Sequence, residues 1–315
     1  MAQIGNDISI AADLLSAGKL VGIPTETVYG LAGDATQEDA ILQIFKTKNR
    51  PKFDPLIAHV SSIDRARELV TDIPDIIEQI MKDSWPGPLT VLLEKNNKVS
   101  DLLTSGSPRI AIRMPRHPLT LELLDSIDFP LAAPSANPFG YVSPTSARHV
   151  ADQLGDKIDY ILDGGSCQVG VESTIIGMDK KQLTVYRLGG VPVESLELYA
   201  KVKLHLNQSS NPQAPGMIKS HYAPSKKIIV GQLASLIANS KVKEFGVISF
   251  QKNYPEAKQC IRLSPTGSVE EAAKHLFDAL RVMDDSDVPI IYSEWVPDHG
   301  LGKAINDRLK RAAAR

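Results

Sequence analysis

Short apolar runs alternate with amphipathic segments along the first 200 residues, and this alternation limits the folds that the chain can adopt. Residues 20–23, 56–60 and 89–93 have the length and apolar character of buried strands. Residues 8–17 carry apolar side chains at helical spacing, and Ser143 followed by proline predicts the start of another helix. Strands that alternate with helices indicate an α/β sheet, here a twisted mixed sheet with flanking helices.

The alternation stops at a polar stretch that has the composition of a linker. Residues 207–216 are rich in Asn, Gln, Ser and Pro and show no periodicity. Strand-like runs then return at 228–230, 245–250 and 289–292, in an order that fits a small doubly wound domain. We therefore expect three parts, namely a first domain over 1–203, a linker over 204–224, and a small Rossmann-like α/β domain over 225–315.

Charge and cysteine content exclude several classes of protein. The 315 residues include 35 Lys and Arg against 37 Asp and Glu, which argues against binding nucleic acid with the whole surface. Two cysteines, Cys167 and Cys260, are too few for a disulfide scaffold or a cysteine-rich zinc site. No apolar run approaches the ~18 residues of a membrane span, and the first residues lack a signal-peptide pattern. We expect a soluble cytoplasmic protein without a membrane partner.

Four cations stand at alternate positions within seven residues, at Lys46, Lys48, Arg50 and Lys52. In an extended chain this spacing points all four side chains the same way, where they repel one another unless an anion lies opposite. A polyphosphate is the natural partner of such a group, because arginine offers a planar fork and lysine a point charge. The alternative is a solvated loop after a helix, whose cations suit the C-terminal end of the helix dipole.

A second cationic pair, Arg109 and Arg113, lies on one face of a strand predicted over 109–114. Such a face either meets solvent or presents its charges to a ligand beyond the strand end, where α/β sheets bind ligands. The loops 133–137 and 170–174 offer hydroxyl, amide and backbone groups for hydrogen bonds. Neither a Ser/His/Asp arrangement nor a phosphate-loop motif is present, so the sequence indicates no covalent nucleophile.

An ordered set of motifs along nearly the whole chain resembles the two-domain L-threonylcarbamoyladenylate synthases, in which a YrdC-like domain precedes a C-terminal extension. Each motif alone is modest, whereas their order and spacing together are highly specific. The resembling stretches are Ile-Pro-Thr-Glu-Thr-Val-Tyr-Gly-Leu at 23–31, Lys-Asn-Arg-Pro at 48–51, Trp-Pro-Gly-Pro-Leu-Thr at 85–90, Arg-Met-Pro at 113–115, Pro-Ser-Ala-Asn at 134–137, Ser-Pro-Thr at 143–145, Asp-Gly-Gly at 163–165, Val-Glu-Ser-Thr at 171–174, and Ala-Pro-Gly-Met at 214–217 with His-Tyr-Ala-Pro at 221–224.

The resemblance implies a nucleotidyltransferase reaction. L-threonine and bicarbonate would give an N-carboxylated amino acid that attacks the α-phosphorus of ATP, with threonylcarbamoyl-AMP and pyrophosphate as products. A tRNA threonylcarbamoyl transferase complex would then use the product to modify an adenosine beside the anticodon, and weak binding of tRNA itself is a further expectation. Charge neutralisation and positioning suffice for such an in-line attack, which agrees with the cation run and the missing nucleophile.

The resemblance also implies which residues form the site. L-threonine would be held by Thr27, His59, Arg113, the Ala133 backbone and Ser173. ATP would be bound by Lys48, Arg50, Asp54, Arg109, Ser135, Asn137, Ser143, Arg187 and Tyr222. Asp54 would act through metal or water, and Tyr222 would belong to a linker that closes over the site. Mg²⁺ would ride mainly on the ATP phosphates, without a protein cage of its own.

Three other interpretations compete with the synthase. A non-catalytic RNA-binding module of YrdC-like fold would use a basic surface, although aromatic residues for base stacking make up only 5% of the chain. A hydrogenase-maturation carbamoyltransferase would need cysteine-rich zinc segments and a longer chain. A scaffold that recruits partners through the C-terminal domain would keep its turnover after that domain was removed.

Overall fold

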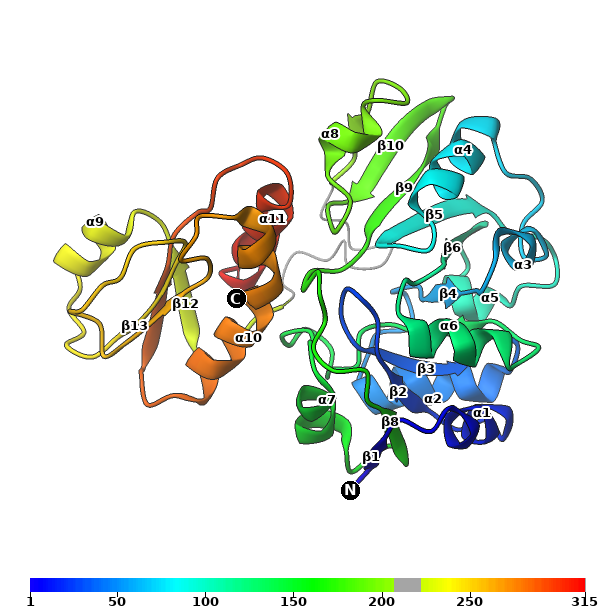
Figure 1. Ribbon diagram of the computed structural model, residues 1–315, viewed down its shortest axis with the longest axis horizontal. Coiled ribbons are helices and arrows are strands. Elements are labelled where there is room, and N and C mark those ends of the chain that lie inside the picture. The colour runs from blue at the N-terminus through cyan, green and yellow to red at the C-terminus, as the bar shows by residue number, and fades with distance from the viewer. Residues whose placement is uncertain (207–221, 315) are drawn as a thin grey trace.

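The computed structural model describes residues 1–206 and 222–314, which form two α/β domains (Figure 1). Eleven strands of the first domain build one mixed sheet in the order β1-β8-β2-β3-β7-β4-β6-β5-β9-β10-β11. The strands are β1 (Gln3–Gly5), β2 (Val21–Ile23), β3 (Gly30–Asp34), β4 (Ile57–His59), β5 (Leu89–Glu94), β6 (Arg109–Arg113), β7 (Leu131–Ala132), β8 (Tyr160–Leu162), β9 (Thr174–Asp179), β10 (Gln182–Arg187) and β11 (Lys203–Leu204). The predicted mixed sheet with flanking helices is thereby confirmed.

The helices of the first domain cover the sheet. They are α1 (Ile8–Ser16), α2 (Glu38–Lys48), α3 (Ile63–Arg67), α4 (Asp75–Ser84), α5 (Asp101–Thr104), α6 (Pro118–Asp125), α7 (Ala147–Leu154) and α8 (Val193–Leu196). Helix α1 packs against α6 and β8, whereas α2 packs against β3 and α4 against β5. Among the described residues, no helix is both long and apolar enough to cross a membrane.

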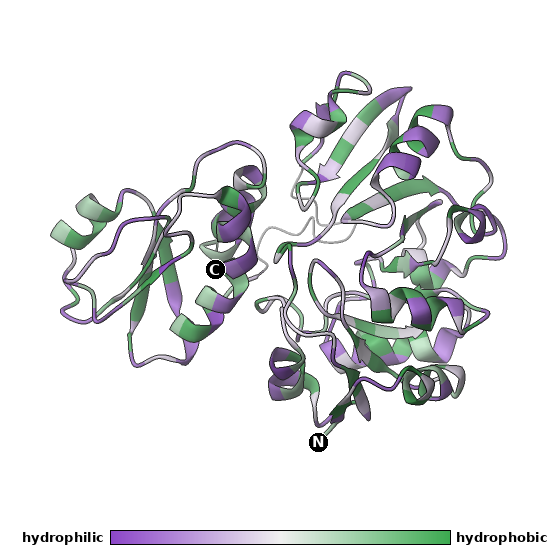
Figure 2. Ribbon diagram, in the orientation of Figure 1, coloured by the Kyte–Doolittle hydropathy of each residue, from purple (hydrophilic) through white to green (hydrophobic). Residues whose placement is uncertain are grey.

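The core lies between these helices and the sheet. Ile41 and Ile44 on one face of α2, with Val91 and Ile112 from neighbouring strands, are fully buried in it. Figure 2 shows the same division, with hydrophobic residues concentrated along the strands and hydrophilic ones on outer helix faces. Removal of this apolar surface from water is the main term that stabilises the sheet, at about 25 cal/mol per Å².

The second domain contains four parallel strands in the order β12-β15-β13-β14, which confirms the small doubly wound fold. Its elements are β12 (Lys227–Val230), α9 (Leu233–Ala238), β13 (Gly246–Ser249), β14 (Gln259–Arg262), α10 (Val269–Asp285), β15 (Ile290–Ser293) and α11 (Gly302–Ala312). Ser268 caps α10 by accepting hydrogen bonds from the backbone of Glu270 and Glu271. Helices α10 and α11 lie on the side of this domain that faces the first one (Figure 1).

Side chains of α10 join the two domains through buried polar contacts. The carboxylate of Asp284 accepts a hydrogen bond from the Tyr141 hydroxyl at 2.7 Å and others from the backbone of Ser225 and Lys226. The Arg281 guanidinium lies over the Tyr141 ring, 5.3 Å from its centroid. Because these groups are partly or fully removed from water, the contact positions the second domain firmly against the segment 141–143.

Two local expectations were wrong. The cation run is not extended, because α2 continues to Lys48 and Asn49 then adopts a left-handed conformation with a φ of 55°. This turn buries Lys48 and Arg50 but leaves Lys46 exposed, so the cations do not share one face. Ser143 does not begin a helix either, since α7 starts at Ala147 with Ser146 as its cap. The Ser143 hydroxyl instead donates to a buried glutamate far along the chain, a partner that local pattern does not reveal.

Candidate functional site

A pocket lies where several strands of the large sheet end at one edge. His59 and Arg113 are the last residues of the parallel strands β4 and β6 and are aligned with each other. Strand β9 begins at this same edge directly after Ser173, and β10 ends there at Arg187. The lining residues are Thr25, Val28, Gly30, Ile57, His59, Arg113, Ala133, Pro134, Ser135, Glu172, Ser173 and Arg187, around about 340 Å³ of empty space that includes the mouth. The structure thus brings six of the predicted site residues to one cavity.

Arg113 is held by the segment that follows β2. Its Nη1 donates to the Thr27 hydroxyl at 2.9 Å, and its Nη2 lies 2.9 Å from Glu26 Oε1. Glu26 belongs to the resembling stretch at 23–31, but the resemblance predicts no role for it. Both side chains are about 5% exposed, so the Arg113 guanidinium is held away from solvent by the neutralising carboxylate of Glu26. The predicted threonine contacts Thr27 and Arg113 therefore belong to one cluster.

Arg187 reaches the pocket from the end of β10. Its Nε and Nη2 donate to the Ser173 carbonyl at 3.0 and 2.9 Å, and Nη2 also donates to the Ser173 hydroxyl at 2.9 Å. That hydroxyl shares a 2.7 Å hydrogen bond with Thr90 of β5. Burial, with repulsion from Arg113 among the smaller causes, lowers the pKa of Arg187 to about 10, so the group stays charged at neutral pH. Two buried guanidinium groups therefore serve one cavity.

His59 is neutral in this setting. Burial and the nearby charge of Arg113 lower the pKa of its imidazole from 6.5 to about 3. Its Nδ1 lies 3.2 Å from the Ile57 carbonyl, which orients the ring. The imidazole therefore offers a ligand an uncharged ring beside a permanent cation.

Because the His59 imidazole is buried in its neutral form, lowering the pH should reduce the stability of the folded protein. The unfolded chain takes up a proton on His59 below about pH 6.5, whereas the folded chain does so only near pH 3, so stability falls across that window. Between pH 7.5 and 5 this residue should lower the free energy of unfolding by about 2 kcal/mol. Urea unfolding of His59→Asn should show a pH dependence weaker by that amount. Replacement of the exposed His299 should leave it unchanged, and equal pH dependence of wild type and His59→Asn would contradict the assignment.

Lys48 is buried with its ammonium against backbone carbonyls. Its Nζ donates to the carbonyl of Ser135 at 2.6 Å and to that of Asn137 at 2.5 Å. Burial, with repulsion from Arg50, lowers the pKa of Lys48 well below its ordinary value. The lysine thus binds α2 to the loop that carries two other predicted ATP contacts. The Asn137 Nδ2 donates to the Tyr141 carbonyl, which extends the connection to the interface segment.

Arg50 and Asp54 form a pair that the sequence did not predict. Arg50 Nη2 lies 2.8 Å from Asp54 Oδ2, and further bonds run to the backbone carbonyls of Asp54 and Pro55. Asp54 is fully buried. The pairing explains how a carboxylate sits among predicted phosphate ligands, because Asp54 offsets the Arg50 charge and shapes the loop after α2.

Glu172 and Arg308 are the functional candidates that sequence reasoning missed. Glu172 Oε1 accepts from the Ser143 hydroxyl at 2.7 Å, and Oε2 accepts from Nε of Arg308 at 2.8 Å. Burial alone would raise the pKa of Glu172, but the charges of Arg308 and Arg187 lower it overall. A signal for Arg308 was present, since it follows Ile305 by three residues and so falls on the apolar stripe of α11.

Tyr222 is the first described residue after the gap at 207–221. It is 1% exposed, stacks on Phe277 at 5.6 Å between centroids, and lies under the Arg308 guanidinium at 5.0 Å. The same Arg308 guanidinium pairs with Glu172, which lines the pocket, so Tyr222 lies beside the candidate site. The linker motif at 214–217 and His221 lie outside the described residues.

Arg109 lies apart from the other predicted ATP contacts. It begins β6, whereas Arg113 ends that strand, and its Nη1 donates to the Tyr186 hydroxyl at 2.9 Å. It lines a separate cavity that also contains Leu92 and Met178. The two arginines of β6 therefore serve different ends of the sheet.

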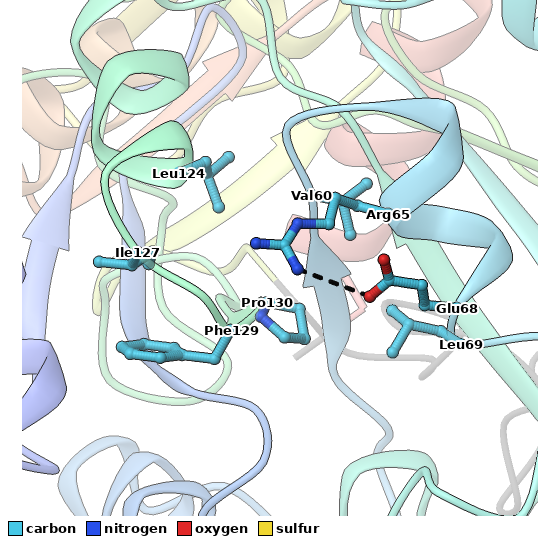
Figure 3. Close-up of a pocket in the computed structure, with 8 residues that line it drawn as sticks. All are labelled: Val60, Arg65, Glu68, Leu69, Leu124, Ile127, Phe129 and Pro130. Atoms are coloured by element: carbon cyan, nitrogen blue, oxygen red, sulfur yellow. Dashed lines mark ion pairs between the residues drawn. The ribbon is translucent and has the colours of Figure 1, made fainter.

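Another pocket, with about 280 Å³ of empty space that includes open solvent, lies between α3 and the segment after α6 (Figure 3). Its walls are largely apolar, with Leu69, Leu124 and Phe129, and Arg65 lies 3.6 Å from Glu68 at its rim. Its lining contains none of the predicted site residues, so it is separate from the candidate site.

The described part of the chain holds no cluster of three His, Cys, Asp or Glu side chains suited to a metal ion. Cys167 does not supply a reactive thiolate, because burial and the Glu26 charge raise its pKa to about 12. The charge of the pocket is instead dominated by guanidinium groups. It suits ligands that carry carboxylate or phosphate groups.

Comparison with known proteins gives consistent matches over both domains. The Sua5/YciO/YrdC family model, described as "Telomere recombination", matches residues 13–189, and the model "Threonylcarbamoyl-AMP synthase, C-terminal domain" matches 191–314. A threonylcarbamoyl-AMP synthase of Pyrococcus abyssi is 41% identical over 322 aligned residues, covering 97% of this chain and 94% of that protein. The Bacillus subtilis enzyme of the same name is 36% identical, with coverage of 97% and 92%. The crystal structure of P. abyssi Sua5 complexed with L-threonine superposes with a TM-score of 0.93 at 38% identity, covering 99% of this chain and 97% of that one.

Proposed function

The chain belongs to the two-domain threonylcarbamoyl-AMP synthase family, and from this premise we propose that it is a nucleotidyltransferase acting on L-threonine, bicarbonate and ATP. The threonine amine and bicarbonate give a carbamate and water. A carbamate oxygen then forms a bond to the α-phosphorus of ATP while the bond to the leaving pyrophosphate breaks. Threonylcarbamoyl-AMP is the product, and a tRNA threonylcarbamoyl transferase complex is its proposed consumer.

One observation carries the proposal, namely that Arg113 and Arg187 reach a single buried cavity from two different strands. Such a pair suits a reaction that brings together a carboxylate and a phosphate. We assign the threonine carboxylate to Arg113, near the Thr27 hydroxyl and neutral His59. We assign the phosphate chain to Arg187, Ser135 and Ser143.

The remaining assignments follow from this division. Ala133 and Ser173 complete the threonine side, and Lys48, Arg50, Asp54, Asn137 and Tyr222 belong to the nucleotide side. Arg109, at the other end of β6, is assigned to neither side. Mg²⁺ is proposed to arrive on the ATP phosphates, where it would offset their charge, because Glu172, the carboxylate in the pocket lining, is already paired with Arg308. The burial of Lys48 and Arg50 removes the exposed basic run on which an RNA-binding module would depend. The cytoplasmic location stays a prediction.

Pyrophosphate release tests the function directly. With ATP, bicarbonate and Mg²⁺, we expect release that depends on L-threonine, together with threonylcarbamoyl-AMP detected by mass spectrometry. L-serine lacks one methyl group and should be used less efficiently by about 10–200-fold in kcat/KM. Absence of threonine-dependent release, while ATP still binds, would contradict the proposal.

A further inference from the structure

Both interface helices of the second domain send one buried arginine into the first domain. Arg308 of α11 is fully buried, and besides its bond to Glu172 its Nη2 donates to the Leu188 carbonyl at 2.9 Å. Arg281 of α10 donates through Nη2 to the Val142 carbonyl and through Nε to the Ser143 carbonyl at 3.4 Å. These contacts join residues more than 100 positions apart in the sequence.

The two arginines hold the two ends of one hydrogen bond. Ser143 and Glu172 come from different loops of the first domain and are joined by their 2.7 Å contact. Arg281 holds the backbone at the Ser143 end, and Arg308 holds the carboxylate at the Glu172 end. Glu172 lines the pocket and precedes Ser173, which binds Arg187. The second domain therefore determines where part of the pocket wall lies.

The charges around Glu172 indicate a more specific role for Arg308. A carboxylate as buried as Glu172 requires a cation, since an unpaired buried charge is strongly destabilising. Arg308 contacts it at 2.8 Å, whereas Arg187 acts on it through space. If Arg308 were removed, Arg187 would be the remaining arginine that acts on Glu172, and the same guanidinium is the one assigned to the phosphate chain.

We infer that Arg308 is a positioning residue of the site, which neutralises Glu172 so that this carboxylate does not compete with the nucleotide for Arg187. The inference deepens the proposed function and rests on it for the identity of the nucleotide. The second domain is thus part of the nucleotide site through a residue of α11.

Substitution at two positions tests the inference in the full-length protein. Arg308→Met should raise the KM for ATP at least tenfold and change the KM for threonine less than threefold. The double variant Glu172→Gln/Arg308→Met removes both charges and should return the KM for ATP to within about threefold of wild type. Arg308→Lys keeps a positive charge but lacks the Nη2 bond to Leu188. Its KM for ATP should lie much closer to that of wild type than to that of Arg308→Met.

Lys303→Met is the matched control. Lys303 belongs to the same helix and pairs across the same interface with Glu194 at 2.7 Å, but its side chain is 30% exposed and lies outside the pocket. It should change neither KM. The thermal midpoint of each variant shows whether the substitution destabilises the fold. A merely structural role of Arg308 predicts that the KM for ATP and the KM for threonine rise by similar factors.

Three outcomes would overturn the inference. They are equal effects on both substrates, effects of Lys303→Met as large as those of Arg308→Met, and a double variant no better than the single one. The affinity for a non-hydrolysable ATP analogue, measured by calorimetry, gives the same comparison without turnover. If wild type releases no pyrophosphate, Arg308→Met can still lower the affinity for the analogue tenfold and the double variant can still restore that affinity. In that case the proposed function fails and the positioning role of Arg308 stands.

Discussion

Replacement of Arg113 by methionine should lower kcat/KM for threonine by about 10²–10³-fold, because truncating one partner of a buried charged pair costs about 3–4 kcal/mol. Its guanidinium ends β6 inside the pocket and is fixed by Thr27 and Glu26. The loss should appear as a higher KM for threonine in the pyrophosphate assay, since the carboxylate of free threonine already needs this cation.

A second substitution separates this effect from loss of the fold. Arg113→Met leaves Glu26 buried without its partner, which is itself destabilising. Arg113→Lys keeps a charge beside Glu26 and should retain the thermal midpoint, yet it should still raise the KM for threonine at least tenfold because the planar fork is lost. Arg109→Met, at the other end of the same strand, should spare the KM for threonine. A wild-type KM for threonine in Arg113→Lys would contradict the assignment.

Replacement of Lys48 by methionine should raise the KM for ATP by about 30–100-fold. The ammonium group makes charge-assisted bonds to the Ser135 and Asn137 carbonyls, and each such bond is worth about 1.5–3 kcal/mol. Without them, the loop that supplies two predicted ATP contacts loses its anchor on α2. The effect on threonine should be smaller, because Arg113 and His59 belong to other strands.

Lys46→Met gives the matched control for this second substitution. Lys46 lies in the same last turn of α2 but is exposed, so its loss should leave both KM values unchanged. Steady-state measurements with each substrate varied in turn would check the comparison. A KM for ATP within threefold of wild type in Lys48→Met, or equal effects of the two substitutions, would show that Lys48 serves neither the loop nor the nucleotide.

The order of strands and helices was largely predictable, because periodicity depends on neighbours along the chain. The runs at 20–23, 56–60 and 89–93 correspond to β2, β4 and β5. Strand β3 was missed, since its sequence Gly-Leu-Ala-Gly-Asp lacks both alternation and a β-branched run. It is a strand because β2 and β7 pair with it on either side.

The candidate site was predictable as a set of residues but not as an arrangement. The resemblance identified His59, Arg113 and Arg187, and the sheet brings them to one pocket. It could not show that Lys48 and Arg50 would be turned inward by the left-handed residue at the end of α2. Nor could it show the acidic partners of the arginines, since pairing depends on groups brought together by the fold.

By itself, the sequence determined the alternation of elements, the break between two α/β domains, and the family to which the chain belongs. All three depend on local pattern or on ordered motifs, which can be recognised without knowing any tertiary contact. Only the tertiary structure decided which cations face the pocket, which are paired by Glu26 or Glu172, and that Arg308 reaches across from the second domain. The physical reason is that the free energy of a buried charge depends on partners distant in sequence, here 136 residues away for Arg308.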